Sequence, residues 1–195
     1  MPSHVAVIGR TAYIRDNAGV YKLDLDTKAL SFIEGSQGAL KNRMAVVGNK
    51  VFVPAGKSIL VLENGAVAET IAMDGTVTGV VKSDEAGYLW ISCSASPAQI
   101  IKLAAGDYTQ EKHTLTAGGV ASGWGATPGI TAKGDEIYFC NNSSTIYRHT
   151  FSSNTTETLG DVKSNIANWG MIYNMPAVHP VTGEYYYNTL SLIHI

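Results

Sequence analysis

The chain has 195 residues, of which 45% are hydrophobic and only 15% are charged, and its formal net charge is −2. This balance excludes the clustered positive charge with which proteins neutralise nucleic-acid phosphates. Its apolar runs are far shorter than the roughly 20 residues that a membrane-spanning helix needs. We therefore expect one large domain over residues 1–195, with no nucleic-acid partner and no transmembrane segment.

A short pattern of strand-forming residues recurs five times, at intervals of 34 to 50 residues. The copies begin at Ala6-Val7-Ile8, Ala45-Val46-Val47, Gly79-Val80-Val81, Gly129-Ile130-Thr131 and Ala177-Val178-His179. Intervals of roughly 40–50 residues are typical of β-propellers, in which each blade must stack on its neighbours to bury its faces. The sequence therefore predicts an all-β propeller of four-stranded antiparallel blades with almost no helix.

Taken in chain order, the repeats predict blades at residues 5–34, 44–73, 77–116, 129–159 and 176–195. The first four blades each contain four predicted strands, at 5–9, 12–16, 20–24, 30–34; 44–48, 51–54, 58–62, 67–73; 77–82, 88–93, 99–103, 109–116; and 129–132, 136–141, 145–150, 155–159. The fifth has only two, at 176–180 and 184–188, so about four and a half blades are present. Turn-forming residues separate the strands at 17–19 and 26–28, and Asn64-Gly65 is a hairpin signal.

The two ends of the chain carry further expectations. No signal peptide is visible, yet Val5 already lies within the first repeat, so we expect a fragment whose true start lies upstream. Residues 192–195 resemble translated sequencing-adapter sequence, and the alternative is a real third strand of the fifth blade. An open arc would expose apolar residues of the first blade, such as Val7 and Tyr21, and we expect self-association. A closed five-bladed propeller is the alternative.

The segment Val20-Tyr21-Lys22-Leu23-Asp24 resembles the third strand of quinoprotein-like and surface-layer-type β-propellers. The later half resembles secreted surface propellers of gut bacteria, at Leu89-Trp90-Ile91-Ser92-Cys93, Gly123-Trp124-Gly125, Asn168-Trp169-Gly170-Met171 and Val178-His179-Pro180. This resemblance implies a seven-bladed propeller, of which this chain is a part, at the bacterial cell surface or in the periplasm. Relatives include corrinoid-binding lipoproteins, so the resemblance implies a corrinoid ligand or an outer-membrane protein partner; a glycan is a further alternative.

Cys93 and Cys140 are the only cysteines, and they lie near the ends of equivalent strands. Aligning the two strands places Cys93 opposite Asn141 rather than Cys140, so the thiols should point to opposite faces of their blades. We expect buried free thiols; the alternatives are a disulfide and a metal or redox role.

No motif in the sequence names a chemistry. The five histidines are dispersed and form no metal-binding pattern, so we expect no metal and no cofactor. We expect His113 and His149 to be solvated on outer strands, no paired histidines, and a structural role for His179. The favoured function is a non-enzymatic surface binding or scaffold module. The alternative is a propeller enzyme, a quinoprotein-like dehydrogenase or a lyase.

The candidate binding site lies on the connections between the last strand of one blade and the first strand of the next. These connections converge at one end of a propeller, and loops on a rigid scaffold commonly carry binding residues. Aromatic residues with a few polar groups are typical of small-molecule sites; the candidates are Asn42, Arg43, Trp124, Trp169, Tyr173 and Asn174. The alternative for each tryptophan is a structural one, in which it fills the gap between adjacent blades.

Overall fold

The computed structural model describes residues 4–38, 43–115, 130–140, 145–161, 177–179 and 181–186. Every regular element within those ranges is a β-strand, which confirms the predicted fold class. The strands form four sheets of four strands and one of two strands, each antiparallel and each built from consecutive strands. Within the same ranges no helix is long and apolar enough to cross a membrane.

Each sheet is a propeller blade, numbered here in chain order. Blade 1 contains β1 (His4–Ile8), β2 (Thr11–Arg15), β3 (Val20–Asp24) and β4 (Leu30–Phe32). Blade 2 contains β5 (Ala45–Val47), β6 (Lys50–Ala55), β7 (Ser58–Glu63) and β8 (Ala66–Ala72). Blade 3 contains β9 (Val77–Lys82), β10 (Tyr88–Cys93), β11 (Gln99–Ala104) and β12 (Gln110–Thr114). Blade 4 contains β13 (Thr131–Lys133), β14 (Glu136–Cys140), β15 (Thr145–Thr150) and β16 (Thr155–Asp161), and the fifth blade contains β17 (Ala177–Val178) and β18 (Tyr185–Tyr186).

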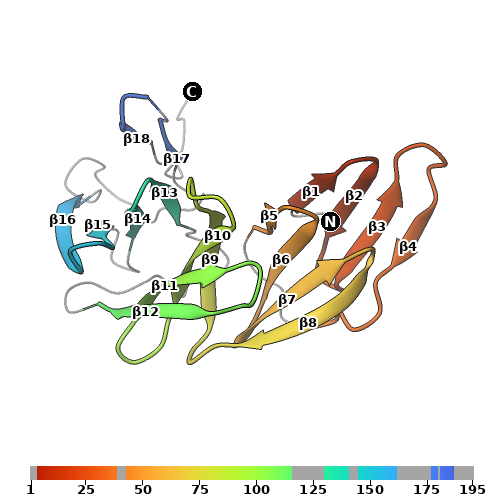
Figure 1. Cartoon of the computed structure of the whole chain (residues 1–195), viewed down its shortest axis with the longest axis horizontal. Coiled ribbons are helices and arrows are strands. Elements are labelled where there is room, and N and C mark those ends of the chain that lie inside the picture. The colour runs from red at the N-terminus through yellow and green to blue at the C-terminus, as the bar shows by residue number, and fades with distance from the viewer. Residues whose placement is uncertain are drawn as a thin grey trace, which may run out of the picture.

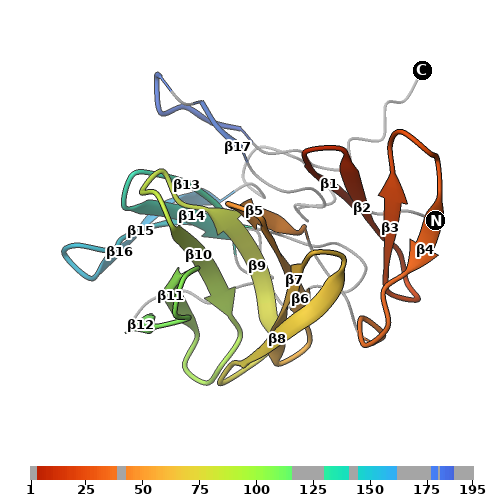
Figure 2. The ribbon, with the colours of Figure 1, turned by 45° about the vertical axis from the view of Figure 1, so that its right-hand side comes forward.

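The blades are arranged around a common axis with their first strands innermost. The strands β1, β5, β9, β13 and β17 contact one another in that order. Figure 1 and Figure 2 show the sheets fanned side by side, with the last strands of the four-stranded blades at the periphery. The prediction that the first strand of every blade lines the axis is therefore confirmed.

Strand positions follow the sequence closely, because local patterns of β-branched and aromatic residues decide them. The bounds predicted for β3, β9, β10 and β15 are those observed, and the other strands of the four-stranded blades differ from prediction by at most two residues at either end. The two strands of the fifth blade, β17 and β18, each contain two residues and lie within the segments predicted for them.

The turns between strands have the predicted side-chain chemistry. Asp24 Oδ1 accepts hydrogen bonds from the backbone N–H groups of Asp26 and Thr27 at 2.8 and 2.9 Å. At the turn between β7 and β8, Asn64 and Gly65 have φ values of 52° and 82°. Two consecutive residues with positive φ are what a two-residue type I′ hairpin requires, and Asn-Gly is its preferred sequence.

Apolar side chains alternate between the two faces of a strand, and each face contributes to a different core. Between blades 1 and 2, Val51 and Val53 of β6 join the core that contains Tyr13. Phe52, which lies between the two valines, points the other way into the core that blades 2 and 3 share. A third core lies between blades 3 and 4 and includes Trp90. The blades thus stack by burying both faces of the intervening sheets.

The two cysteines are free and buried, as the sequence predicts. Cys93 belongs to the core between blades 2 and 3. Cys140 follows Phe139, which packs toward blade 3, so alternation directs Cys140 to the opposite face of blade 4. Burial raises the pKa of the Cys140 thiol to about 12, and it also raises the pKa of Cys93. Both thiols are therefore protonated at neutral pH and act as small apolar side chains.

Candidate functional site

A cavity of about 440 Å³ lies among the inner strands of the blades. Its volume is within the roughly 300–1,000 Å³ range of small-molecule pockets. Residues from all five blades line it: His4, Arg43, Met44, Ala45, Val46, Val80, Val81, Lys82, Ile130, Thr131 and Ala177. Among these lining residues the ionisable side chains are His4, Arg43 and Lys82, all of them basic. We call this space the axial cavity. Its lining is therefore mostly apolar with a positive electrostatic character.

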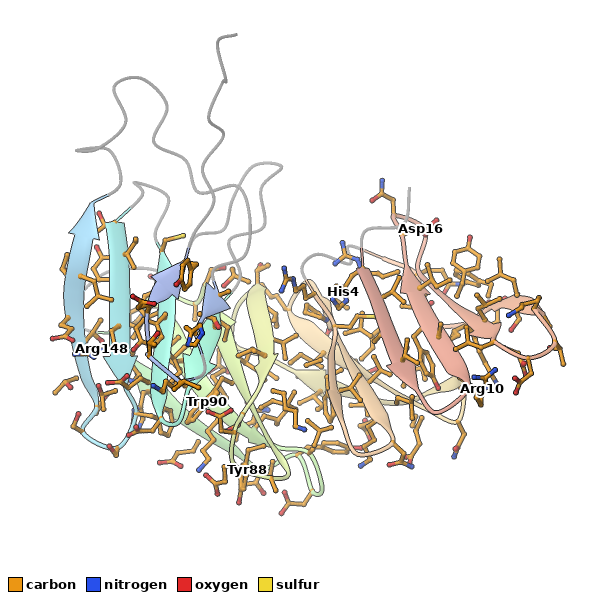
Figure 3. All side chains as sticks on the ribbon, turned by 90° about the horizontal axis from the view of Figure 1, so that it is seen from above. His4, Arg10, Asp16, Tyr88, Trp90 and Arg148 are labelled. Atoms are coloured by element: carbon orange, nitrogen blue, oxygen red, sulfur yellow. The ribbon has the colours of Figure 1, made fainter. Side chains whose placement is uncertain are left out.

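His4 is fixed at the junction between blades 1 and 2 (Figure 3). Its Nδ1 accepts a hydrogen bond from the backbone N–H of Met44 at 3.0 Å. Burial, followed by the positive charges of Arg43 and Arg15, lowers the pKa of His4. Since Nδ1 is an acceptor, the neutral ring carries its proton on Nε2, which is a hydrogen-bond donor.

Arg15 adds a second, more deeply placed positive charge near His4. The two residues are cross-strand partners in the pairing of β1 with β2, so their side chains lie on the same face of blade 1. Arg15 is only 6% exposed, and its burial lowers the pKa of the guanidinium. The positive charges of Arg15 and Arg43 together favour an anion over a cation near this end of the axial cavity.

Of the six residues predicted for a ligand site, the structure describes one. Arg43 is exposed, immediately precedes Met44 and lines the axial cavity, on the connection between blades 1 and 2 where the prediction placed it. The other five candidates lie outside the described residues: Asn42, Trp124, Trp169, Tyr173 and Asn174. The prediction of a site formed by all six therefore stays a prediction.

The prediction that His113 and His149 are solvated and unpaired is wrong. His149, on β15, is completely buried, and its Nε2 lies 3.2 Å from Nδ1 of His113 on β12. Nδ1 of His149 lies 2.9 Å from the hydroxyl of Thr156. His113 also stacks on Phe151, with ring centroids 3.7 Å apart and planes inclined by 6°. The histidines therefore join the outer parts of blades 3 and 4, away from the axial cavity.

Burial is the main cause of a shifted pKa in this histidine pair. It lowers the pKa of His149 to about 4, and the neighbouring His113 acts in the same direction. Alternation along the chain was the signal that could have revealed the buried position. His149 lies between Tyr147 and Phe151 at every second residue, so it shares a face with two buried aromatic side chains.

His179 has the structural role that the sequence predicts, although it lies just beyond β17 and is exposed. Its Nδ1 accepts hydrogen bonds from the backbone N–H groups of Val181 and Thr182, at 3.3 and 3.1 Å. The ring therefore closes the turn that leads to β18.

Three solved structures of bacterial proteins have a fold similar to that of this chain. A quinoprotein alcohol dehydrogenase-like protein from Bacteroides thetaiotaomicron has a TM-score of 0.66 and 18% identity, over 95% of this chain and 49% of its own. The extracellular domain of a hybrid two-component system from the same species has a TM-score of 0.66 and 8% identity, over 95% and 25%. Hydrazine synthase from Kuenenia stuttgartiensis has a TM-score of 0.62 and 14% identity, over 81% and 49%.

These likenesses establish the fold, and the chain spans between a quarter and about half of the length of the three structures. A search of curated proteins gave no match. A family model described as "Domain of unknown function (DUF5074)" matches residues 1–192. Because that match extends over nearly the whole sequence, the chain belongs to the DUF5074 family.

Proposed function

We propose that this chain is a non-enzymatic binding module, at the surface or in the periplasm of a bacterium, whose axial cavity holds a small anionic ligand. The observation that carries the proposal is the lining of that cavity, in which Arg43 and Lys82 provide positive charge beside apolar side chains. An organic anion fits such a lining, since its charged group pairs with the basic residues and its apolar part contacts valine and isoleucine. The bacterial extracellular domain among the structural neighbours supports the location.

His4 supplies the geometry for this proposal. Met44 holds its Nδ1, so the Nε2–H of the neutral ring is the group left to donate to an anionic ligand. Because burial, followed by the neighbouring positive charges, lowers the pKa of His4, we expect it to bind as a neutral donor at pH 7. The positive charge for the ligand then comes from Arg43 and Lys82.

Calorimetric titration of the purified chain with organic anions tests the proposal, in a panel that includes a corrinoid and an acidic glycan. We expect binding that weakens as salt is added, because screening reduces the attraction between opposite charges. Arg43→Gln and Lys82→Gln should each weaken binding about tenfold, corresponding to about 1.4 kcal/mol. The matched control is Arg10→Gln, because Arg10 is exposed and pairs with Asp26 outside the cavity lining. Wild-type affinity in both cavity variants would overturn the proposal.

The second candidate function is a propeller enzyme, and the histidine pair is the feature that favours it. Histidine is the side chain that most often acts in acid–base catalysis, and these two rings lie within hydrogen-bond distance, at 3.2 Å. However, His149 is fully buried in the outer contact between two blades rather than beside the axial cavity. We therefore favour a structural role for the pair and retain the binding module as the proposed function.

A further inference from the structure

A second cavity, also of about 440 Å³, lies between blades 3 and 4. Its lining comes from the turns after β9, β13 and β15 and from the strands β10, β11 and β12: Ser83, Glu85, Trp90, Lys102, Glu111, Gly134, Asp135, Phe151 and Ser152. These turns lie at the opposite end of the blades from the connection that carries Arg43, since neighbouring strands are antiparallel. We call this space the interblade cavity. It shares no lining residue with the axial cavity.

Trp90 contributes a buried indole N–H group to the lining of the interblade cavity (Figure 3). Its side chain is 2% exposed, and its Nε1–H has no hydrogen-bond acceptor among the described residues. Indole N–H groups that are buried normally find a partner, because an unpaired donor loses its bond to water without replacement. A ligand in the cavity that carries an acceptor would supply that partner.

Lys102 is a second donor, held in a fixed position on the same wall. Its Nζ lies 2.6 Å from a carboxylate oxygen of Glu85. The same nitrogen lies 4.4 Å from the centroid of the Tyr88 ring and 5.8 Å from that of Trp90. Contacts with two aromatic faces and one carboxylate restrict the lysine to a narrow range of positions. A pre-organised ammonium group of this kind binds a ligand oxygen at low entropic cost.

The cavity also presents acceptors, from three carboxylates. Glu85 pairs with Lys102, and Glu111 is largely exposed with one oxygen 3.9 Å from Nε2 of His113. Asp135 accepts hydrogen bonds from the hydroxyl and the backbone N–H of Ser152, and the hydroxyl bond lowers the pKa of Asp135. Within this lining three acidic groups therefore face one basic group. An anion would be repelled, whereas a simple cation would leave the indole N–H without an acceptor.

Aromatic packing gives the cavity a rigid apolar wall. Phe151 is 6% exposed and lies against Trp90, with ring centroids 4.8 Å apart and planes inclined by 56°. On its other side it stacks on His113. The polar groups of the lining are thus set around an apolar surface that cannot easily move.

We propose that the interblade cavity binds a neutral polyhydroxylated ligand, a sugar unit whose oxygens accept hydrogen bonds from Trp90 and Lys102 and whose hydroxyls donate to Glu111 and Asp135. Hydroxyl groups are both donors and acceptors, so a sugar satisfies every polar group that the cavity presents. This site is independent of the anionic ligand proposed for the axial cavity.

Saturation-transfer NMR and calorimetric titration with neutral mono- and disaccharides test the proposal on the whole chain. We expect saturable binding of at least one sugar, with an affinity that changes little with salt, because the ligand is uncharged. Trp90→Phe keeps the ring but removes the N–H, and we expect binding at least tenfold weaker. Glu111→Gln changes an exposed side chain that the fold does not need, and we expect binding about fivefold weaker.

Two control variants make the outcome decisive. Glu69→Gln alters an exposed carboxylate of β8 outside the cavity lining, and Arg43→Gln alters the axial cavity; both should bind sugar as the wild type does. Circular dichroism checks that Trp90→Phe remains folded, and Glu111→Gln provides the test if it does not. The absence of saturable sugar binding would overturn the proposal, and so would wild-type affinity in a folded Trp90→Phe or in Glu111→Gln. Displacement of the sugar by inorganic phosphate at low concentration would also overturn it.

Discussion

Blade 1 and blade 3 have the same four-stranded architecture, but their surroundings differ. Blade 3 is covered on both sides: Leu89, Ile91 and Cys93 of β10 pack on blade 2, while Trp90 packs on blade 4. Blade 1 packs on blade 2 through one face, which includes Ala6 and Tyr13. On the other face of blade 1, Val5 and Val7 are 51% and 52% exposed, and Leu30 is 59% exposed.

The exposed face of blade 1 is nevertheless apolar. Strand pairing places its side chains in two cross-strand rows, Val5–Ile14–Tyr21–Phe32 and Val7–Ala12–Leu23–Leu30. Both rows consist entirely of apolar or aromatic residues. An apolar pattern on a propeller strand therefore indicates a face that can stack. Whether the side chains of that face are buried depends on the blade that lies against it.

The largest expected difference in stability between blades 1 and 3 comes from replacing one leucine in each blade by alanine. Leu89 is fully buried, so Leu89→Ala leaves a cavity in the core and should lower the free energy of unfolding by about 2–5 kcal/mol. Leu30→Ala removes the same atoms from an exposed position and should change stability by less than about 0.5 kcal/mol. Urea denaturation of both variants measures the difference. Equal losses would show that the outer face of blade 1 is covered in solution.

The second test measures the free energy of unfolding as a function of pH. The contact between blades 3 and 4 buries a histidine, whereas the outer face of blade 1 buries none. The folded pKa of His149 is about 4 and its ordinary value is 6.5. The folded chain therefore binds fewer protons than the unfolded chain between these values, so stability is complete above pH 6.5 and falls as pH decreases toward 4. The full loss is about 3 kcal/mol. His4, whose pKa is also lowered, acts in the same direction.

Denaturation at several pH values between 4 and 8 measures this loss. His149→Gln should flatten the profile, since glutamine does not titrate, although it also lowers stability at neutral pH. Asn17→Gln is the control, because Asn17 is exposed and neither side chain titrates, and it should leave the slope unchanged. A wild-type slope in His149→Gln would contradict the assignment.

A third test isolates local effects, which do not depend on stacking. Gly48 has a φ of 60° with open space where a Cβ would lie, and Gly48→Ala should cost about 1 kcal/mol, because a side chain is strained in the left-handed region. Gly106 has no such conformation and has open space around its Cα. Gly106→Ala should therefore leave the thermal unfolding midpoint nearly unchanged. Equal effects in the two variants would contradict this account.

The smallest expected change in stability comes from Val7→Thr on the outer face of blade 1. Threonine keeps the β-branched shape and the strand preference, so the free energy of unfolding should change by less than about 0.5 kcal/mol. Self-association should decrease, because exposed apolar faces drive association. Sedimentation velocity at several concentrations measures this effect. A wild-type chain that remains monomeric at every concentration would contradict the prediction of self-association.

Local sequence patterns predicted the strands, the turns and the order of the blades correctly. Strands such as β9 and β10 were predicted with their observed bounds, and so was the Asn64-Gly65 turn, because each depends on residues only a few positions apart. The position of Arg43 on the connection before β5 followed from the same blade pattern.

Which faces are covered and which distant side chains meet depends on how the blades pack against one another. The pairing of His113 with His149 joins residues 36 positions apart, and Trp90 meets Phe151 across the contact between blades 3 and 4. No local pattern encodes such contacts, because they depend on the spacing and rotation of two stacked sheets. Stacking also explains why similar apolar rows are buried in blade 3 and exposed on the outer face of blade 1.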